Sequence, residues 1–341
     1  MAPPARMLPD RWCVVRLGHL GDVALATGVL RWWHATRGWR FVFVTRAANA
    51  PLLQGHPAID TVVAVPETSL DGAAWLAQCR ALAARFPGHG LLDLHGTLRS
   101  RVLARSWTGP VRRYPKFPLR RRLYLATRWP LLAGPLFATN VPQRYALAVE
   151  AAAPDRAELL PSITLAPAEL EAGRVALAPL LRPGAPCVAL HPYATHPDKA
   201  WPADHWRTLA ARLDAASVNW FAIGRADAPI PGLDAARDFT NRTDLRQTCA
   251  LLAHAAALVT GDSGPMHLAS GVGTPVISLF GPTNAAWGFV PAGPRDVVLE
   301  RPLACRPCSL HGKRPCPHGR ECLAGIAVDA VMDAVGTVIR A

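Results

Sequence analysis

The chain has 341 residues, of which 50% are hydrophobic and 18% are charged. This length exceeds the usual size of one hydrophobic core and predicts two domains. The composition argues against a largely disordered chain, and the lack of any apolar run of ~18 residues argues against a transmembrane helix. The formal net charge of +13 predicts an acidic partner, which can be a nucleic acid, an anionic membrane surface or a phosphorylated substrate.

The N-terminal half alternates short apolar runs with segments of helical periodicity. Its first ten residues contain no continuous apolar stretch of the kind that a signal peptide has, which favours a cytoplasmic protein. The alternation is typical of a parallel sheet with helices on both faces. The expected strands are 13–17, 41–44, 61–65 and 90–94, and the expected helices are 23–34, 70–85 and 98–107.

A glycine-containing turn separates the first expected strand from the first expected helix. Gly18 and Gly21 let the backbone approach a ligand closely, and Asp22 stands where the helix begins. One interpretation of Asp22 is a helix N-cap, which is a common use of aspartate. The other is a catalytic base at the carboxyl end of the strand, where open α/β sheets bind their ligands. Position alone favours the cap.

Polar residues also follow the fourth expected strand. Asp93 and His95 are candidates for contacts to an acceptor substrate, but formation of the turn explains them at least as well. Arg99 is a stronger candidate for an anionic acceptor, because a guanidinium binds a carboxylate through two hydrogen bonds.

A cluster of cations interleaved with aromatic residues comes next. The aromatic residues favour binding to an anionic acceptor or a membrane face over a solvated surface stripe. The cluster comprises Arg112, Arg113, Lys116, Arg120, Arg121, Arg122 and Arg128, with Tyr114, Phe117, Tyr124 and Trp129.

The proline-rich stretch 151–186 contains the expected boundary between the domains, which we place after residue 165. The strand-first pattern then starts again, so a ligand cleft is expected between the carboxyl edges of two sheets. The second domain, 166–325, is followed by the segment 326–341, in which the apolar periodicity of 328–339 predicts a helix. We expect this helix to return to the first domain. The expected strands of the second domain are 187–191, 220–223, 255–259 and 275–280.

The segment 258–282 combines a buried strand, a glycine turn and a helix that begins near Pro265. The free N–H groups and the positive end of the dipole of such a helix form an anion site, most often for phosphate. The segment contains neither GxGxxG nor GxxxxGK[ST]. His267, one turn into the helix, is either a packing residue or a direct contact to phosphate.

Four segments, in this order, resemble glycosyltransferase family 9, the lipopolysaccharide heptosyltransferases. The resemblance covers nearly the whole chain and implies the α/β fold called GT-B, in which two Rossmann-like domains face each other across a cleft. Residues 1–165 would bind the acceptor and residues 166–325 the nucleotide sugar. The matching segments are 16–23 (RLGHLGDV), 93–100 (DLHGTLRS), 191–192 (HP) with 199–202 (KAWP), and 261–269 (GDSGPMHLA) with 280–283 (FGPT).

The resemblance implies an inverting transferase that moves a heptose or related sugar from an ADP-sugar donor to the lipid A-Kdo or core oligosaccharide acceptor. Such an enzyme is cytoplasmic and peripheral to the inner membrane. The resemblance makes Asp22 the base that deprotonates the acceptor hydroxyl, which reverses the preference for a helix N-cap at this position. It places Lys199 near the diphosphate, with Thr195 close by.

The remaining implied contacts fall into two groups. On the nucleotide-sugar side they are Asp262, Ser263, Gly264, Met266 and His267. On the acceptor side they are Gly21, Asp93, His95, Arg99 and Arg120. The chain has no Asp-x-Asp motif, which favours stabilisation of the departing diphosphate by the helix N-terminus and Lys199, without a cofactor.

Four of the eight cysteines, Cys305, Cys308, Cys316 and Cys322, form a C-x2-C-x7-C-x5-C array. In a cytoplasmic protein, this array fits a structural zinc or iron site better than disulfides. The alternative is a surface loop with free thiols, and His311 and His318 are additional potential ligands. Cys13, Cys79, Cys187 and Cys249 lie in apolar segments and are expected in the core.

Two other functions are compatible with parts of the sequence. An epimerase or hydrolase acting on a sugar nucleotide would use the same fold. A nucleic-acid-binding protein is suggested by charge alone, and no helix-turn-helix, RRM or zinc-finger pattern supports it, so we expect no nucleic-acid partner.

Overall fold

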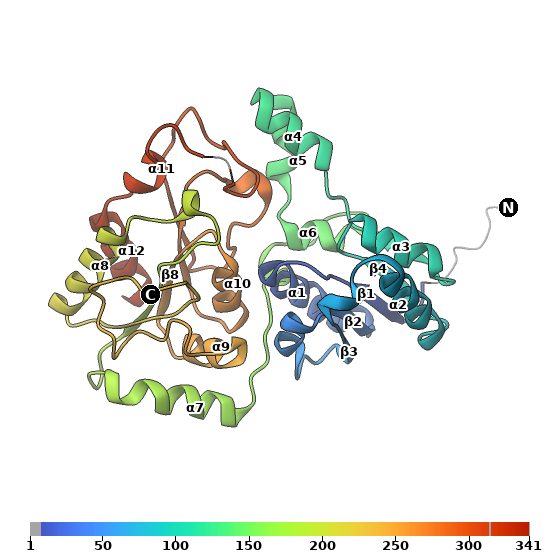
Figure 1. Cartoon of the computed structure of the whole chain (residues 1–341), viewed down its shortest axis with the longest axis horizontal. Helices are drawn as coiled ribbons and strands as arrows, with labels where there is room; N and C mark the ends of the chain where they lie inside the picture. The colour runs from blue at the N-terminus through green and yellow to red at the C-terminus, as the bar shows by residue number, and fades with distance from the viewer. Residues whose placement is uncertain (1–7, 314, 341) are drawn as a thin grey trace. The chain divides into compact units, whose positions relative to one another are not determined.

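The computed structural model describes residues 8–313 and 315–340, and the chain divides into two compact units (Figure 1). Unit 1 comprises Met1–Lys116 and Pro142–Leu159, and unit 2 comprises Phe117–Val141 and Leu160–Ala341. Each unit contains a five-stranded parallel sheet. The predicted α/β class with two parallel-sheet domains is therefore confirmed.

Unit 1 is built around β1 (Arg11–Val15), the central strand in the order β3-β2-β1-β4-β5. β1 pairs in parallel with β2 (Arg40–Arg46) and β4 (Gly90–Asp93), and β3 (Ile59–Val65) and β5 (Val111–Arg113) form the edges. Because the carboxyl ends of β1 and β4 lie side by side, the segments that follow these strands meet at one edge of the sheet.

Helix α1 (Leu20–Arg37) follows β1 and is buried from Gly21 to Leu30. Its Trp33 packs against Trp39, with ring centroids 5.8 Å apart, and donates a hydrogen bond from Nε1 to Glu150 at 2.8 Å. That bond joins the returning segment Pro142–Leu159 to the core of unit 1. The other helices of this core are α2 (Gly72–Arg85) and α3 (Leu98–Ser106).

Unit 2 is built around β8 (Ala257–Gly261), in the order β10-β9-β8-β6-β7. β8 pairs with β6 (Cys187–His191) and β9 (Val276–Phe280), while β7 (Asn219–Ala222) and β10 (Val297–Glu300) are the edges. The helices that complete this unit's layers are α7 (Pro167–Leu177), α8 (Ala203–Ala215), α9 (Leu245–Ala253), α10 (Gly264–Gly271), α11 (Glu321–Ala324) and α12 (Val328–Arg340).

Helix α12 packs in unit 2, so its predicted return to the first domain is wrong. Val331, Val335 and Val338 are buried in one apolar cluster with Trp206 of α8 and Ile277 of β9. Their spacing puts them on one face of the helix. That face completes the core of unit 2. The periodicity of the sequence shows that this face is apolar, but it does not show which residues the face packs against.

The division of the chain also differs from the predicted boundary after residue 165. The segment 117–141, which contains α4 (Pro118–Thr127) and α5 (Pro130–Ala138), belongs to unit 2. The reason is Leu136, which is fully buried against Ala286 and Trp287 of unit 2. The chain therefore enters unit 2 at Phe117, returns to unit 1 at Pro142 and leaves it again after Leu159.

The remaining elements are short. They are α6 (Val141–Ala146) and the 3-10 helices η1 (Ala47–Leu53), η2 (Glu67–Ser69), η3 (Ala157–Leu159), η4 (Ala178–Leu180), η5 (Pro197–Lys199) and η6 (Ala285–Trp287). Within residues 8–313 and 315–340, none of the helices has the length and apolar character needed to cross a bilayer.

Candidate functional site

The first cluster of functional side chains lies at the carboxyl end of β1. Helix α1 begins at Leu20 with His19 as its N-cap residue, and no side chain caps it. Asp22 therefore lies inside the first turn, and the interpretation of Asp22 as an N-cap is wrong. Its carboxylate forms an ion pair with Arg16 and accepts a hydrogen bond from the Tyr145 hydroxyl at 3.2 Å.

Burial and charge fix the protonation states around Asp22, which is only 7% exposed. Burial works against the charge on Arg16, but the Asp22 carboxylate together with Tyr145 and Tyr114 outweighs burial, and the pKa of Arg16 is raised. Burial also raises the pKa of Tyr145 well above its ordinary value. Arg16 is thus a permanent cation and Tyr145 a neutral donor, and together they hold the Asp22 carboxylate in one orientation.

Arg16 also joins the ends of two strands. Its Nη1 donates to the carbonyl of Leu94 at 2.9 Å and to that of His95 at 3.4 Å, both just after β4. Neither Arg16 nor Tyr145 was predicted as a site residue. Arg16 lies within a matching segment, whereas Tyr145 is 123 residues from Asp22 and has no local signal.

Asp93 forms the turn after β4, which confirms the structural alternative for this residue. Its Oδ1 accepts hydrogen bonds from the amides of His95 at 3.1 Å and Gly96 at 2.8 Å. Its Oδ2 accepts one from Nε of Arg113 at 2.7 Å, and the side chain is fully buried. Gly96 has a positive φ of 61°, which a glycine adopts without strain.

The His95 ring lies beside Gly18, where a Cβ atom would come within 3.2 Å of the ring Cε1. Burial, together with the charges of Arg16 and Lys116, lowers the pKa of His95 to about 3. His95 is therefore neutral at physiological pH. Its buried Nδ1 has no hydrogen-bond partner within the described part of the chain.

The other predicted acceptor contacts are not all brought together. Gly21 is buried in α1 next to Asp22. Arg99 donates from Nε to the Leu70 carbonyl at 2.8 Å and forms an ion pair with Asp71. Arg120 is part of unit 2, where its guanidinium lies 5.7 Å from the centre of the Phe117 ring.

The second cluster lies where β6 and β8 end. Register places His191 opposite Thr260, and His191 Nδ1 lies 3.0 Å from the Thr260 hydroxyl and 3.2 Å from the Ser263 hydroxyl. Ser263 is the N-cap residue of α10, but its side chain does not cap the helix. The first N–H groups of α10 thus remain without a side-chain cap, as an anion site requires.

Lys199 lies next to this turn. Its Nζ is 2.6 Å from Oδ2 of Asp262 and 3.3 Å from the Asp262 carbonyl, and the same Oδ2 accepts a hydrogen bond from Thr283 at 2.7 Å. The ion pair is mostly buried, with side-chain exposures of 16% for Lys199 and 12% for Asp262. The structure therefore brings together Lys199 and the α10 turn, the two groups that the family resemblance places near the diphosphate.

The other predicted nucleotide contacts differ in exposure. Thr195 is exposed on the loop before η5, and Gly264 is the first residue of α10. Met266 is fully buried, and His267 is 4% exposed with its ring 6.2 Å from that of Phe289. The buried side chains of Met266 and His267 fit packing roles, while their backbone N–H groups belong to the first turn of α10.

Burial of His191 makes stability depend on pH. It lowers the pKa of His191 to about 4, below the ordinary value of about 6.5. Between these values the unfolded chain binds a proton that the folded chain does not, so the free energy of unfolding falls as the pH falls from about 6.5 to about 4. We expect His191→Asn to make this decline shallower in urea titrations at several pH values.

His318, which is exposed, provides the control, because His318→Gln should leave the slope at its wild-type value. Two other buried histidines contribute to the same decline, since burial also lowers the pKa of His56 to about 4 and that of His95 to about 3. The His191 variant should therefore reduce the slope without abolishing it. A wild-type slope in this variant would show that His191 does not titrate as inferred.

The four clustered cysteines, Cys305, Cys308, Cys316 and Cys322, border one small cavity of unit 2 together with His318. However, in the described residues no three His, Cys, Asp or Glu side chains are arranged to hold a metal ion. The present geometry thus does not form the predicted zinc or iron site. The other four cysteines, Cys13, Cys79, Cys187 and Cys249, are buried, which confirms their assignment to the core.

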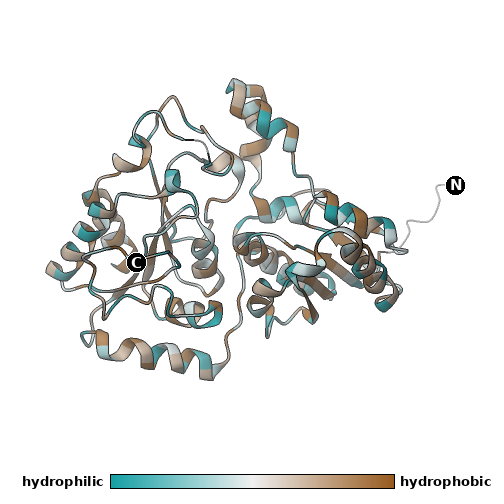
Figure 2. Cartoon of the chain, in the orientation of Figure 1, coloured by the Kyte–Doolittle hydropathy of each residue, from teal (hydrophilic) through white to brown (hydrophobic). Residues whose placement is uncertain are grey.

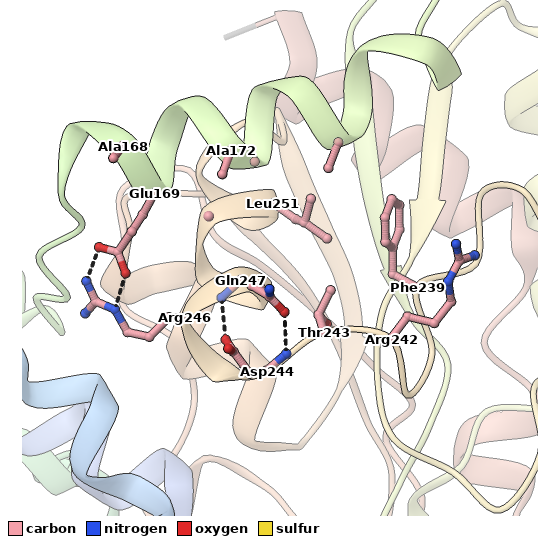
Figure 3. Close-up of a pocket in the computed structure, with 13 residues that line it drawn as sticks. Ala168, Glu169, Ala172, Phe239, Arg242, Thr243, Asp244, Arg246, Gln247 and Leu251 are labelled. Atoms are coloured by element: carbon pink, nitrogen blue, oxygen red, sulfur yellow. Dashed lines mark hydrogen bonds and ion pairs between the residues drawn. The ribbon is translucent and has the colours of Figure 1, made fainter.

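A cavity of about 600 Å³ lies between α7 and α9 (Figure 3). It contains none of the predicted site residues. Its polar groups are already paired: Arg246 donates to Glu169 at 2.7 Å, and the Asp244 carboxylate accepts from the Gln247 amide at 2.8 Å. We therefore place the candidate site at the strand ends and not in this larger space.

Residues 89–316 match the family model described as glycosyltransferase family 9 (heptosyltransferase). Lipopolysaccharide heptosyltransferase 1 of Pseudomonas aeruginosa is 36% identical over 134 residues, which are 37% of this chain and 37% of that protein. The alignments with the curated relatives span between 28% and 53% of the lengths of those proteins.

Two solved structures share the fold over nearly the whole chain. The glycosyl transferase family 9 protein of Veillonella parvula has a TM-score of 0.78 at 19% identity, covering 98% of this chain and 99% of that one. The dodecameric iron-containing heptosyltransferase TibC, in complex with ADP-D-β-D-heptose, has a TM-score of 0.57 at 14% identity, covering 98% and 77%. At these identities the likeness establishes the fold alone.

Proposed function

Because the chain belongs to glycosyltransferase family 9, we propose that it is an inverting glycosyltransferase that moves a heptose or a related sugar from ADP-heptose to the inner core of lipopolysaccharide. The acceptor is lipid A-Kdo or a growing core oligosaccharide, met by a cytoplasmic enzyme at the inner membrane. The observation that carries the mechanism is the Asp22 carboxylate, held by Arg16 and Tyr145.

In this proposal Asp22 is the general base. It takes the proton from the acceptor hydroxyl as the oxygen attacks the anomeric carbon of the donor, and the bond from that carbon to the diphosphate breaks on the opposite face. ADP leaves with both electrons of the broken bond. One displacement inverts the configuration of the sugar, and a positioned base of this kind contributes about 10²- to 10⁴-fold to the rate.

Unit 2 binds the nucleotide sugar in this proposal. Lys199 and the N–H groups of the first turn of α10 stabilise the charge that develops on the diphosphate. Asp262, which accepts a hydrogen bond from Thr283, holds the Lys199 ammonium in position, and Lys199 keeps further N–H donors for the phosphate oxygens. The remaining contacts proposed for the nucleotide sugar are Thr195, Ser263, Gly264, Met266 through its backbone, and His267.

Unit 1 supplies the acceptor contacts in this proposal. Gly21 and His95 lie beside Asp22, and Asp93 positions the turn that carries His95. Arg99, and Arg120 of unit 2, are proposed to bind anionic groups of the acceptor. The cysteine cluster stays a prediction of a structural zinc or iron site, and no step of the reaction depends on it.

The decisive experiment incubates the purified protein with ADP-heptose and a heptose-free lipopolysaccharide acceptor. We expect free ADP and a heptosylated lipid, detected by mass spectrometry, with inverted anomeric configuration by NMR. Parallel reactions with other nucleoside-diphosphate sugars would identify the preferred donor. Conversion of ADP-heptose at the same rate without acceptor would instead indicate an epimerase or hydrolase and would contradict the proposal.

A further inference from the structure

The segment Pro118–Ala138, which we call the basic hairpin, exposes an unusual share of the apolar side chains. It consists of α4 and α5, joined by Arg128 and Trp129, and Figure 1 shows the two helices side by side. Eight large hydrophobic side chains are exposed in the described part of the chain, and five of them lie here. These five are Leu119 (67%), Leu123 (42%), Trp129 (55%), Leu131 (71%) and Phe137 (41%).

The basic hairpin packs against the rest of unit 2 through one of its faces. Leu136 is fully buried against Trp287, and the Tyr124 ring meets the Trp287 ring edge-on at 6.2 Å. The Arg121 guanidinium lies over Trp287 at 5.1 Å, and Arg128 donates to the Cys305 carbonyl at 2.9 Å. The helices that carry the exposed apolar side chains are therefore held in place by contacts within unit 2.

The outer face of the basic hairpin combines apolar and cationic groups. Leu119 and Leu123 are four residues apart, so they project from the same side of α4, with the exposed Arg122 between them in sequence. Figure 2 shows the alternation of hydrophobic and hydrophilic residues along α4 and the more uniformly hydrophobic α5. Trp129, between the helices, has the amphipathic ring that settles at a membrane interface.

The charge around the basic hairpin has a single sign. Within the basic hairpin itself the sequence contains four arginines, Arg120, Arg121, Arg122 and Arg128, and no Asp or Glu. A protein partner that carries charges of both signs does not require a surface with positive charges alone. A surface of anionic headgroups over an acyl layer matches both the cations and the exposed leucines.

We propose that the basic hairpin docks unit 2 on an anionic lipid bilayer. Leu119, Trp129 and Leu131 enter the boundary between headgroups and acyl chains, and Arg122 lies at the level of the lipid phosphates. The proposal goes beyond the transferase activity, since it depends on the surface of the hairpin and not on which sugar is moved. Each cation near an anionic surface strengthens binding by roughly fivefold, so salt weakens the association.

The test uses the full chain and flotation with vesicles of phosphatidylcholine, alone or mixed with phosphatidylglycerol. We expect the wild type to float with the mixed vesicles, and Leu119→Ser/Leu131→Ser to bind them about tenfold or more weakly. The matched control is Leu76→Ser/Val175→Ser, which removes two exposed apolar side chains from α2 and α7 and should bind as the wild type does. All four substitutions are at exposed sites, and thermal unfolding confirms that the variants fold.

Any of three flotation results would overturn the proposal: no flotation of the wild type, an equal loss in the Leu76/Val175 control, or undiminished flotation of the Leu119/Leu131 variant. Tight, salt-sensitive binding of an oligonucleotide that displaces the protein from the vesicles would also overturn it, in favour of a nucleic-acid surface. Turnover of a deacylated, water-soluble acceptor separates the two proposals. The Leu119/Leu131 variant should keep that turnover, whereas flotation without any turnover contradicts the transferase and leaves the docking surface intact.

Discussion

Replacing Asp22 by Asn should lower kcat by about 10²- to 10⁴-fold, the range expected for loss of a general base, and should leave donor binding close to wild type. The amide is similar in size to the carboxylate but cannot accept the acceptor proton. Donor binding should persist because its proposed contacts lie in unit 2. Steady-state turnover of ADP-heptose with the lipid acceptor gives kcat, and calorimetric titration with ADP gives the binding constant.

Two variants distinguish a base from a structural carboxylate. Tyr145→Phe removes one donor to Asp22 but keeps the carboxylate, so we expect a smaller loss of kcat than in Asp22→Asn. Asp60→Asn alters an exposed carboxylate of the same unit, paired with Arg40, and should leave kcat within about twofold of wild type, as is usual for a surface substitution. Unchanged turnover in Asp22→Asn would refute the proposed role of Asp22.

The sequence predicts the inner strands of both sheets well, because these strands are buried on both faces and read as continuous apolar runs. The run 187–191 coincides with β6, and 275–280 differs from β9 by one residue. The edge strands β5 and β10 were not predicted. In β5, Val111–Arg113, two of the three residues are exposed cations. Val111 alone gives no apolar pattern from which a strand can be predicted.

The placement of α12 and of the segment 117–141 required the structure. Both have helical signals in the sequence, but periodicity defines only which face is apolar. Val335 and Leu136 find their partners among residues far away in the chain, in α8 and η6. Such pairings follow from tertiary packing and not from any local preference.

In the candidate site too, some features follow from neighbouring residues in the chain, whereas others depend on contacts between residues that are far apart in the sequence. Ser263 and the start of α10 are local features, because the turn and the helix follow one another in the chain. Lys199 reaches Asp262 across 63 residues, and Tyr145 reaches Asp22 across 123. The family resemblance led to Lys199, whereas nothing in the sequence pointed to Tyr145. The turn role of Asp93 is also a local feature, because an Asp side chain commonly accepts hydrogen bonds from amides about two residues further along the chain.

Replacing Lys199 by Met should lower kcat by about 10²- to 10³-fold, the loss typical of removing one group that stabilises a developing negative charge. Methionine keeps the length and the apolar stem of lysine but supplies no ammonium to the departing diphosphate. The affinity for ADP should fall as well, because ADP carries the same charged groups. Both quantities come from steady-state kinetics and calorimetric titration.

A second variant tests whether Lys199 acts on the substrate or only on its neighbour. Lys199→Met alone leaves the largely buried Asp262 carboxylate without its cation, which is costly in itself. Lys199→Met/Asp262→Asn removes both charges and relieves that cost, so thermal stability should recover towards wild type. If Lys199 stabilises the diphosphate, kcat stays low in the double variant, because the missing ammonium is not replaced. If kcat recovers together with stability, Lys199 serves only to neutralise Asp262, and the proposed role in leaving-group stabilisation is wrong.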